Sequence, residues 1–275
     1  MNHLTLLPYT TVQIFKESTY LGSAVLVKVR NAFYVLSSAH VTFGEGCEQY
    51  SDELCSTLTY ESESEEIENL TFIKVLGNLE IFKTYDIIAI EVDVALNIMD
   101  FPEIFFTSDT DKPALEFIFK GRVKSESGKT YSISPCTKNS IGDADIHLEI
   151  PAKFYTDFKG ETGAEVLQGL SGSGVFIHDN NSDKAFLTSI VKSVSEDNFV
   201  GVNCTCISLF KEHLIPEIEL QDYEDYAIEK NTNPQIRQNS TSNNIELEEL
   251  TRSISQSLLS QLMPSSLSGN TDIAL

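Results

Sequence analysis

Short runs of β-branched and aromatic residues recur along most of this chain, and this pattern restricts the fold more than any other feature. Strands are predicted at 11–15, 22–30, 33–36, 71–76, 86–92, 115–119, 130–134, 145–150, 175–177, 185–191 and 199–207. Many short strands separated by turn signals are typical of an all-β sandwich or barrel. Periodicity alone does not choose between these two architectures.

One stretch, Leu-Gln-Gly-Leu-Ser-Gly-Ser-Gly-Val-Phe-Ile at 167–177, places glycines beside two serines just before a predicted strand. Glycine allows unusual dihedrals and close approach of other groups. A serine in such a turn can present its hydroxyl and neighbouring backbone N–H groups to one carbonyl oxygen, as acyl transfer requires. Glycine-serine turns are common in β proteins, so the stretch indicates a catalytic site only if the chain also provides a base and its orienting acid elsewhere.

Two further stretches supply these groups. Phe-Tyr-Val-Leu-Ser-Ser-Ala-His-Val at 33–41 ends in His40, and Tyr-Asp-Ile-Ile-Ala-Ile-Glu-Val at 85–92 carries Asp86 at the start of a strand. With Ser171 from the glycine-rich stretch, the order along the chain is His, Asp, Ser. This is the order found in one of the unrelated folds that carry a catalytic triad.

On these three blocks the sequence resembles the trypsin-like (chymotrypsin-fold) serine peptidases, over roughly residues 10 to 215. Ser-Ser-Ala-His matches the family's Thr-Ala-Ala-His, Asp-Ile-Ile-Ala-Ile its Asp-Ile-Ala-Leu, and Gly-Leu-Ser-Gly-Ser-Gly its Gly-Asp-Ser-Gly-Gly. The resemblance implies two six-stranded antiparallel barrels with the site between them. It also implies that Ser171 is the nucleophile, His40 the base and Asp86 its orienting acid. The N–H groups of Gly169 and Ser171 would form the oxyanion hole, giving a serine endopeptidase that needs no cofactor.

Other candidates fit the blocks less well. His3, His147, His178 and His213 lie in no matching block and are expected to be surface or strand residues. Ser173 would face the same way as Ser171 in an extended register, but the family has glycine or a small residue there. Asp93 falls at the far end of the strand that Asp86 begins. Without the joint pattern, Asp86 itself would be an ordinary strand-capping acid.

Two departures from the family concern regulation. Leu170 stands where digestive members have an aspartate that pairs with a new N-terminus, and no Ile-Val-Gly-Gly-like start is present, which excludes that activation. Val41 stands where secreted members have a disulfide cysteine. The resemblance is therefore to the intracellular, bacterial type. Such peptidases are often attached to or encoded beside sensing proteins, including those of antiviral (antiphage) defence, so the chain is interpreted as a possible effector of a larger assembly.

Composition agrees with a cytoplasmic protein. The five cysteines form no disulfide framework, and no apolar run is long enough to span a bilayer. Metal binding by Cys204 and Cys206 is conceivable, but no His-Cys set with ligand spacing accompanies them, so no metal is expected. The formal net charge of −22 argues against nucleic acid and anionic membranes as partners.

Three domains are predicted: a barrel at 1–110 with His40 and Asp86, a barrel at 111–221 with Ser171, and a tail at 222–275. In the tail, 231–244 is rich in Asn, Gln, Thr and Ser and is expected to be a flexible linker. Residues 245–263 have apolar residues three or four apart, which predicts an amphipathic helix that docks on a partner protein or packs back on the barrels. Residues 44–69 are expected to form a solvated acidic loop.

Specificity is expected to rest on Glu165. In the family, the residue six before the nucleophile lies at the base of the pocket for the side chain preceding the cut. An acid there would select Lys or Arg. The loop has no anchoring disulfide, so Glu161 could take this role, or neither acid could reach the pocket. The alternative function is a catalytically silent barrel used as a protein-binding module.

Overall fold

The computed structural model describes residues 10–50, 56–61, 67–94, 101, 103–110, 116–122, 130–141, 145–151, 154, 167–178, 184–194 and 201–221. The chain divides into two compact units, Met1–Asp222 and Tyr223–Leu275, and every described residue belongs to the first. The predicted linker at 231–244 and helix at 245–263 lie outside the described residues, as do Glu161 and Glu165. These remain predictions.

The first half of the chain forms one seven-stranded antiparallel sheet. Its strands are β1 (Thr11–Lys16), β2 (Thr19–Val29), β3 (Ala32–Ser37), β4 (Thr57–Glu61), β5 (Ile67–Asn69), β6 (Thr71–Leu76) and β7 (Ile88–Asp93). They lie in the order β5-β4-β1-β2-β3-β7-β6. Within the described residues no pairing joins β5 to β6, and this sheet is a half-barrel. Sequence alternation identifies strands but carries no information on closure.

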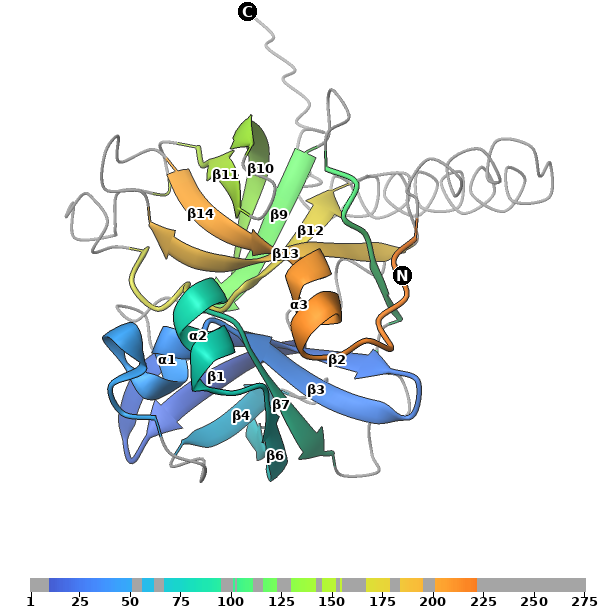
Figure 1. Ribbon diagram of the computed structural model, residues 1–275. Helices are drawn as coiled ribbons and strands as arrows, with labels where there is room; N and C mark the ends of the chain where they lie inside the picture. The colour runs from blue at the N-terminus through green and yellow to red at the C-terminus, as the bar shows by residue number, and fades with distance from the viewer. Residues whose placement is uncertain are drawn as a thin grey trace, which may run out of the picture. The chain divides into compact units, whose positions relative to one another are not determined.

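The second half closes into a barrel. Its strands are β8 (Ile104–Phe106), β9 (Glu116–Arg122), β10 (Thr130–Ile141), β11 (Asp145–Glu149), β12 (Gly174–His178), β13 (Ala185–Val194) and β14 (Gly201–Cys206). They lie in the order β12-β9-β10-β11-β14-β13-β8, and a further pairing of β12 with β13 closes six of them into a ring (Figure 1). β8 adds outside the ring, parallel to β13. The predicted all-β fold and its second six-stranded barrel are confirmed, and the arrangement is compatible with a chymotrypsin-like fold.

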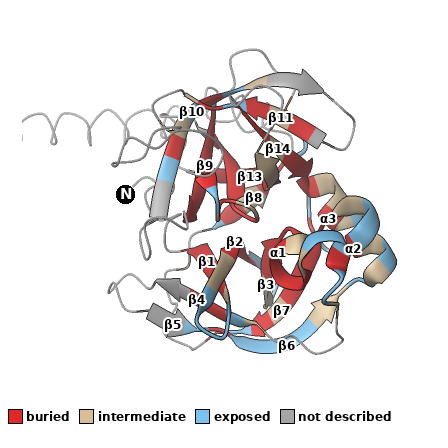
Figure 2. Ribbon diagram, turned by 90° about the vertical axis from the view of Figure 1, so that its left-hand side faces the viewer, coloured by how far each residue is buried: buried red, intermediate tan, exposed pale blue. Residues whose placement is uncertain are grey.

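Three short helices complete the described fold: α1 (Ala39–Phe43), α2 (Leu79–Tyr85) and α3 (Ile207–His213). A single apolar cluster joins both sheets to α3. It includes Val27 and Leu36 from the first sheet, Phe176 and Ile190 from the second, and Phe210 from α3. Figure 2 shows these strands as largely buried, whereas β6 is mainly exposed. Because the two sheets share a core, segments far apart in sequence are fixed against each other at the junction.

The acidic stretch at 44–69 is not the continuous loop that its charge predicts. Residues 57–61 form β4, which pairs with β1, and 67–69 form β5. The side chain of Leu58 is 2% exposed, so one apolar residue in an alternating Thr-Leu-Thr pattern is enough to attach the segment to the sheet. Helix α2 also lies where no helix was predicted. No described helix has both the length and the apolar character needed to cross a membrane.

Candidate active site

His40 lies at the point where the first sheet ends and a helix begins. Strand β3 ends at Ser37, Ser38 has extended dihedrals, and His40 is the second residue of α1. The Ser38 hydroxyl makes no capping bond to α1 and donates instead to the carbonyl of Val191 in β13, over 3.1 Å. The first turn of α1 therefore needs another acceptor for its free backbone N–H groups.

Asp86 provides this acceptor. Its carbonyl accepts from Ala39 N over 3.2 Å, and its Oδ1 accepts from His40 N over 2.9 Å. Asp86 is the C-cap of α2 and has left-handed dihedrals (φ 54°), which Asp tolerates better than most residues. Its second carboxylate oxygen, Oδ2, accepts from His40 Nδ1 over 2.7 Å. One residue thus fixes both the backbone and the imidazole of His40, and leaves Nε2 as the nitrogen free to accept a proton.

Opposing effects set the pKa of His40. Burial lowers the pKa of the imidazole, while the hydrogen bond and charge of Asp86, with the charge of Glu45, raise it. The charge of Lys192 lowers it, and the net pKa lies above the usual histidine value. The side chains of His40 and Asp86 are 21% and 18% exposed, so the pair lies at the surface rather than in the core.

Ser171 lies in a tight turn whose glycines are required by space as well as by dihedral angles. Gly169 and Gly172 have φ values of 96° and 89°. A Cβ on Gly172 would lie 1.8 Å from the carbonyl oxygen of Ser23 and 2.2 Å from Oγ of Ser37. The turn is therefore pressed against β2 and β3, the strands that lead to His40.

Backbone hydrogen bonds attach this turn to both sheets. The carbonyl of Ser171 accepts from Ser23 N in β2 over 3.0 Å, and Gly172 N donates to the carbonyl of Val191 over 2.7 Å. The same Val191 carbonyl accepts from Ser38 Oγ. One carbonyl thus joins the residue after Ser171 to the residue two before His40, so the three predicted catalytic residues belong to one local region.

The carbonyl of Gly169 is held by two hydroxyl groups of the first sheet. Ser23 Oγ donates to it over 2.8 Å and Tyr20 Oη over 3.0 Å. Burial raises the pKa of Tyr20 to about 12, against smaller lowering effects of Ser23 and Arg122, so Tyr20 remains a protonated hydrogen-bond donor. The N–H groups of Gly169 and Ser171 donate to no described residue. Sequence reasoning missed Tyr20 and Ser23, which lie 149 and 146 residues from Gly169.

The two serines of the Ser-Gly-Ser sequence have different environments. Ser171 is partly exposed, whereas Ser173 is 0% exposed and its hydroxyl has no hydrogen-bond partner among the described residues. Ser173 Oγ lies against Gly121, where a Cβ would come within 1.8 Å of it. No hydrogen bond joins Ser171 Oγ to His40 Nε2 within the described residues. His40 and Asp86 are in contact, whereas Ser171 Oγ makes no hydrogen bond to either side chain among the described residues.

The remaining histidines and Asp93 lie elsewhere. His213 stacks on Tyr85, with ring centroids 4.3 Å apart, and His147 bonds to Asn203 in β14. His178 ends β12, Asp93 is exposed at the end of β7, and His3 lies outside the described residues. Among the residues that the structure describes, no group of three His, Cys, Asp or Glu side chains could hold a metal ion.

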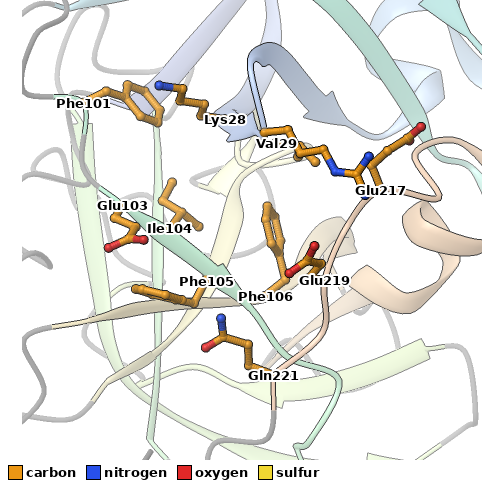
Figure 3. Close-up of a pocket in the computed structure, with 11 residues that line it drawn as sticks. Lys28, Val29, Phe101, Glu103, Ile104, Phe105, Phe106, Glu217, Glu219 and Gln221 are labelled. Carbon is orange, nitrogen blue, oxygen red and sulfur yellow. The ribbon is translucent and has the colours of Figure 1, made fainter.

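The structure also contains a pocket of about 490 Å³, and Figure 3 draws the residues that line it. It combines phenylalanine rings with side chains of both charges, and it is lined by Lys28, Val29, Arg30, Phe101, Glu103, Ile104, Phe105, Phe106, Glu217, Glu219 and Gln221. His40, Asp86 and Ser171 are not among them, so the pocket is separate from the candidate active site.

Comparison with known proteins does not identify a relative: no protein-family model and no curated protein matches the chain.

Proposed function

We propose that this protein is a serine endopeptidase that cleaves protein or peptide substrates through Ser171, His40 and Asp86. The observation that carries the proposal is the shared carbonyl of Val191, which accepts from Gly172 N and from Ser38 Oγ. It brings the Ser171 turn to the segment that bears His40. Two further features supply the other parts that acyl transfer needs: the direct bond between His40 and Asp86, and the N–H groups of Gly169 and Ser171, which donate to none of the described residues.

In the proposed mechanism, His40 Nε2 takes the proton of the Ser171 hydroxyl as Oγ attacks the scissile carbonyl carbon. Asp86 keeps Nδ1 protonated and stabilises the imidazolium that forms. The N–H groups of Gly169 and Ser171 bind the carbonyl oxygen as it becomes negative. His40 then gives its proton to the leaving amine, and water attacks the acyl-enzyme with His40 again as base. The Ser171 hydroxyl must turn toward His40 at the start, and catalytic hydrogen bonds often tighten only when substrate is bound.

The edge of β13 beside Ser171 offers a place for the substrate backbone. β12 pairs with this edge as far as Ile190, and the Ser171 turn covers Val191. Beyond it, residues 192–194 pair only with β14 on the other edge, within the part of the chain that the structure describes. An extended peptide can add to such an edge. Running antiparallel to β13, it would arrive at Ser171 with the residues that precede the cut.

A fluorophosphonate probe tests the chemistry directly. The folded protein should be labelled on Ser171, and Ser171→Ala should abolish labelling, as should heat denaturation of the wild type. Among the described residues no hydrogen bond joins Ser171 to His40, which favours one alternative, a silent barrel used as a protein-binding module. Absence of labelling and of peptide cleavage in the folded protein would select that module.

Specificity for Lys or Arg before the cut remains part of the proposal and rests on Glu165. A peptide library compared between wild type and Glu165→Gln tests it. Selection of small or aromatic residues by the wild type contradicts the assignment. A Lys or Arg preference that is unchanged in Glu165→Gln would also contradict it and would point to Glu161, whose Gln variant is the next comparison.

A further inference from the structure

A row of three polar side chains crosses the second barrel and ends at the open edge of β13. His147 in β11 shares a hydrogen bond of 3.0 Å between its Nδ1 and Asn203 Oδ1 in β14. Asn203 Nδ2 in turn donates to Ser193 Oγ in β13 over 3.3 Å. The strand pairing places His147 opposite Asn203, and Asn203 opposite Ser193, so the row follows the ladder from one strand to the next.

A β-bulge turns Ser193 to this face of the sheet. Val191 pairs with Cys204 and Ser193 with Asn203, so Lys192 is an extra residue on β13. Without it Ser193 would face the same way as Val191, which is fully buried. With the bulge, Ser193 lies on the same partly exposed face as Asn203 and His147. Gly201 leaves room for the imidazole, because a Cβ there would lie 2.5 Å from His147 Nε2.

The direction of the hydrogen bonds leaves one donor at the end of the row. The amide nitrogen of Asn203 donates to Ser193, so its oxygen accepts from the Nδ1–H of His147. Ser193 Oγ is therefore an acceptor within the row, and it donates to no described residue. Its hydroxyl hydrogen remains for a group on the open side of β13.

We infer that Ser193, oriented by Asn203 and His147, forms a subsite that selects a hydrogen-bond-accepting side chain in the substrate. This inference rests on the proposed peptidase function. Cross-strand neighbours in a sheet face the same side, so a peptide that adds to β13 continues the row with its own side chain. The residue opposite Lys192 lies next to Ser171 and precedes the cut. The residue opposite Ser193 is then the second before the scissile bond.

The chemistry at this position favours amides. Asn and Gln present a carbonyl oxygen to the Ser193 hydroxyl, as Asp and Glu present a carboxylate. The chain has a formal net charge of −22, so carboxylates approach against repulsion that amides do not meet. The expected order at this position is Asn and Gln, then Asp and Glu, then Leu and other apolar residues. This position differs from the one that Glu165 would contact, so the two selections are independent.

The test is a peptide series that varies only the second residue before the cut, with kcat/KM measured for wild type and variants. The wild type should prefer Asn or Gln over Leu by about three- to tenfold, the range for one net hydrogen bond. Ser193→Ala should remove this preference, so that the Asn, Gln and Leu peptides are cleaved with similar kcat/KM values. Asn203→Asp should do the same, because its carboxylate accepts the Ser193 hydrogen and withdraws it from the substrate.

Ser108→Ala is the matched control, since Ser108 is exposed and makes no side-chain hydrogen bond with a described residue. It should keep the full preference. Two outcomes would overturn this inference and leave the peptidase proposal standing. One is Ser171-dependent cleavage with no preference at the second residue before the cut. The other is an amide preference that is unchanged in Ser193→Ala. No cleavage of any peptide and no fluorophosphonate labelling by the wild type overturns both.

Discussion

The two halves of the candidate triad are held in different ways. His40 and Asp86 contact each other directly through two hydrogen bonds, and Ala39 N donates a third to Asp86, all inside the first sheet and its helices. Among the described residues the Ser171 turn has no bond to either side chain, and it is fixed by backbone and hydroxyl groups of both sheets. The His40–Asp86 pair is therefore held by local contacts, whereas the position of the Ser171 turn depends on how the half-barrel and the closed barrel pack together.

This difference predicts separate consequences for damage in each half. Changes at Asp86 should act on the protonation and orientation of His40 while the fold persists. Changes in the turn should act on stability and activity together, because Gly172 packs against Ser23 and Ser37 across the junction. The predictions below test this contrast, from the largest expected effect to the smallest.

Ser171→Ala should lower kcat/KM by about 10⁴ to 10⁶, because the Ser171 hydroxyl is the proposed acceptor of the acyl group. Ser173→Ala is a matched control two residues away, and its buried hydroxyl has no partner to lose. It should keep activity within about threefold. Peptide hydrolysis and circular dichroism of both variants check this, and comparable losses in the two would refute the assignment of the nucleophile.

Asp86→Asn should lower kcat/KM by about 10³ to 10⁴ while the protein stays folded. The amide can still accept from the backbone of α1, but it no longer stabilises the imidazolium or fixes the tautomer with Nε2 free. The pKa of His40 should fall, because the charge that raises it is removed. The pH dependence of kcat/KM should therefore move to lower pH, and an unmoved profile would show that Asp86 does not act on the base.

Gly172→Ala should lower the free energy of unfolding by more than about 2 kcal/mol, because a Cβ meets Ser23 and Ser37 and φ is 89°. Gly46→Ala separates the two causes, since Gly46 also has a positive φ (62°) but a Cβ there would lie 4.0 Å from its nearest neighbour, Glu48 Cγ, which is an ordinary contact. It should cost about 1 kcal/mol. Urea unfolding of both variants measures the difference, and equal costs would mean that the close contact at the junction is unimportant.

The sequence predicts the parts of this molecule that depend on local pattern. Strands β1 and β6 begin at the predicted residues, Thr11 and Thr71. The closed barrel was expected from the resemblance to trypsin-like peptidases and not from the spacing of the strands. Helix α2 was missed, although Asn78 caps it and Leu79 and Phe82 have helical spacing. Strand β4 was missed because acidic residues around it outweighed the alternation at 57–60.

The residues of the candidate site also fall into those that a local sequence pattern identifies and those that it does not. His40, Asp86 and Ser171 can be named because each lies in a short recognisable block. Tyr20 and Ser23 could not be named, since nothing near them in sequence indicates that their hydroxyl groups meet Gly169. Such contacts depend on the packing of two sheets, which no local pattern encodes. Whether each sheet closes is equally a property of the whole set of strands.

The smallest effect concerns the charges around His40, and it tests whether this half of the site behaves as a local unit. In the proposed mechanism activity requires neutral His40, so kcat/KM should rise with pH through the pKa of the imidazole, with a midpoint above the usual value of about 6.5. Glu45 raises this pKa and Lys192 lowers it. Glu45→Gln should therefore move the midpoint to lower pH and Lys192→Gln to higher pH.

Asp93→Asn is the control for net charge. It changes the net charge like Glu45→Gln, yet Asp93 is not among the charges that act on His40, so it should leave the midpoint in place. Both shifts should shrink at high salt, because charges near the surface are screened. If Glu45→Gln and Asp93→Asn moved the midpoint equally, the pKa of His40 would follow the net charge of the protein rather than its own neighbours.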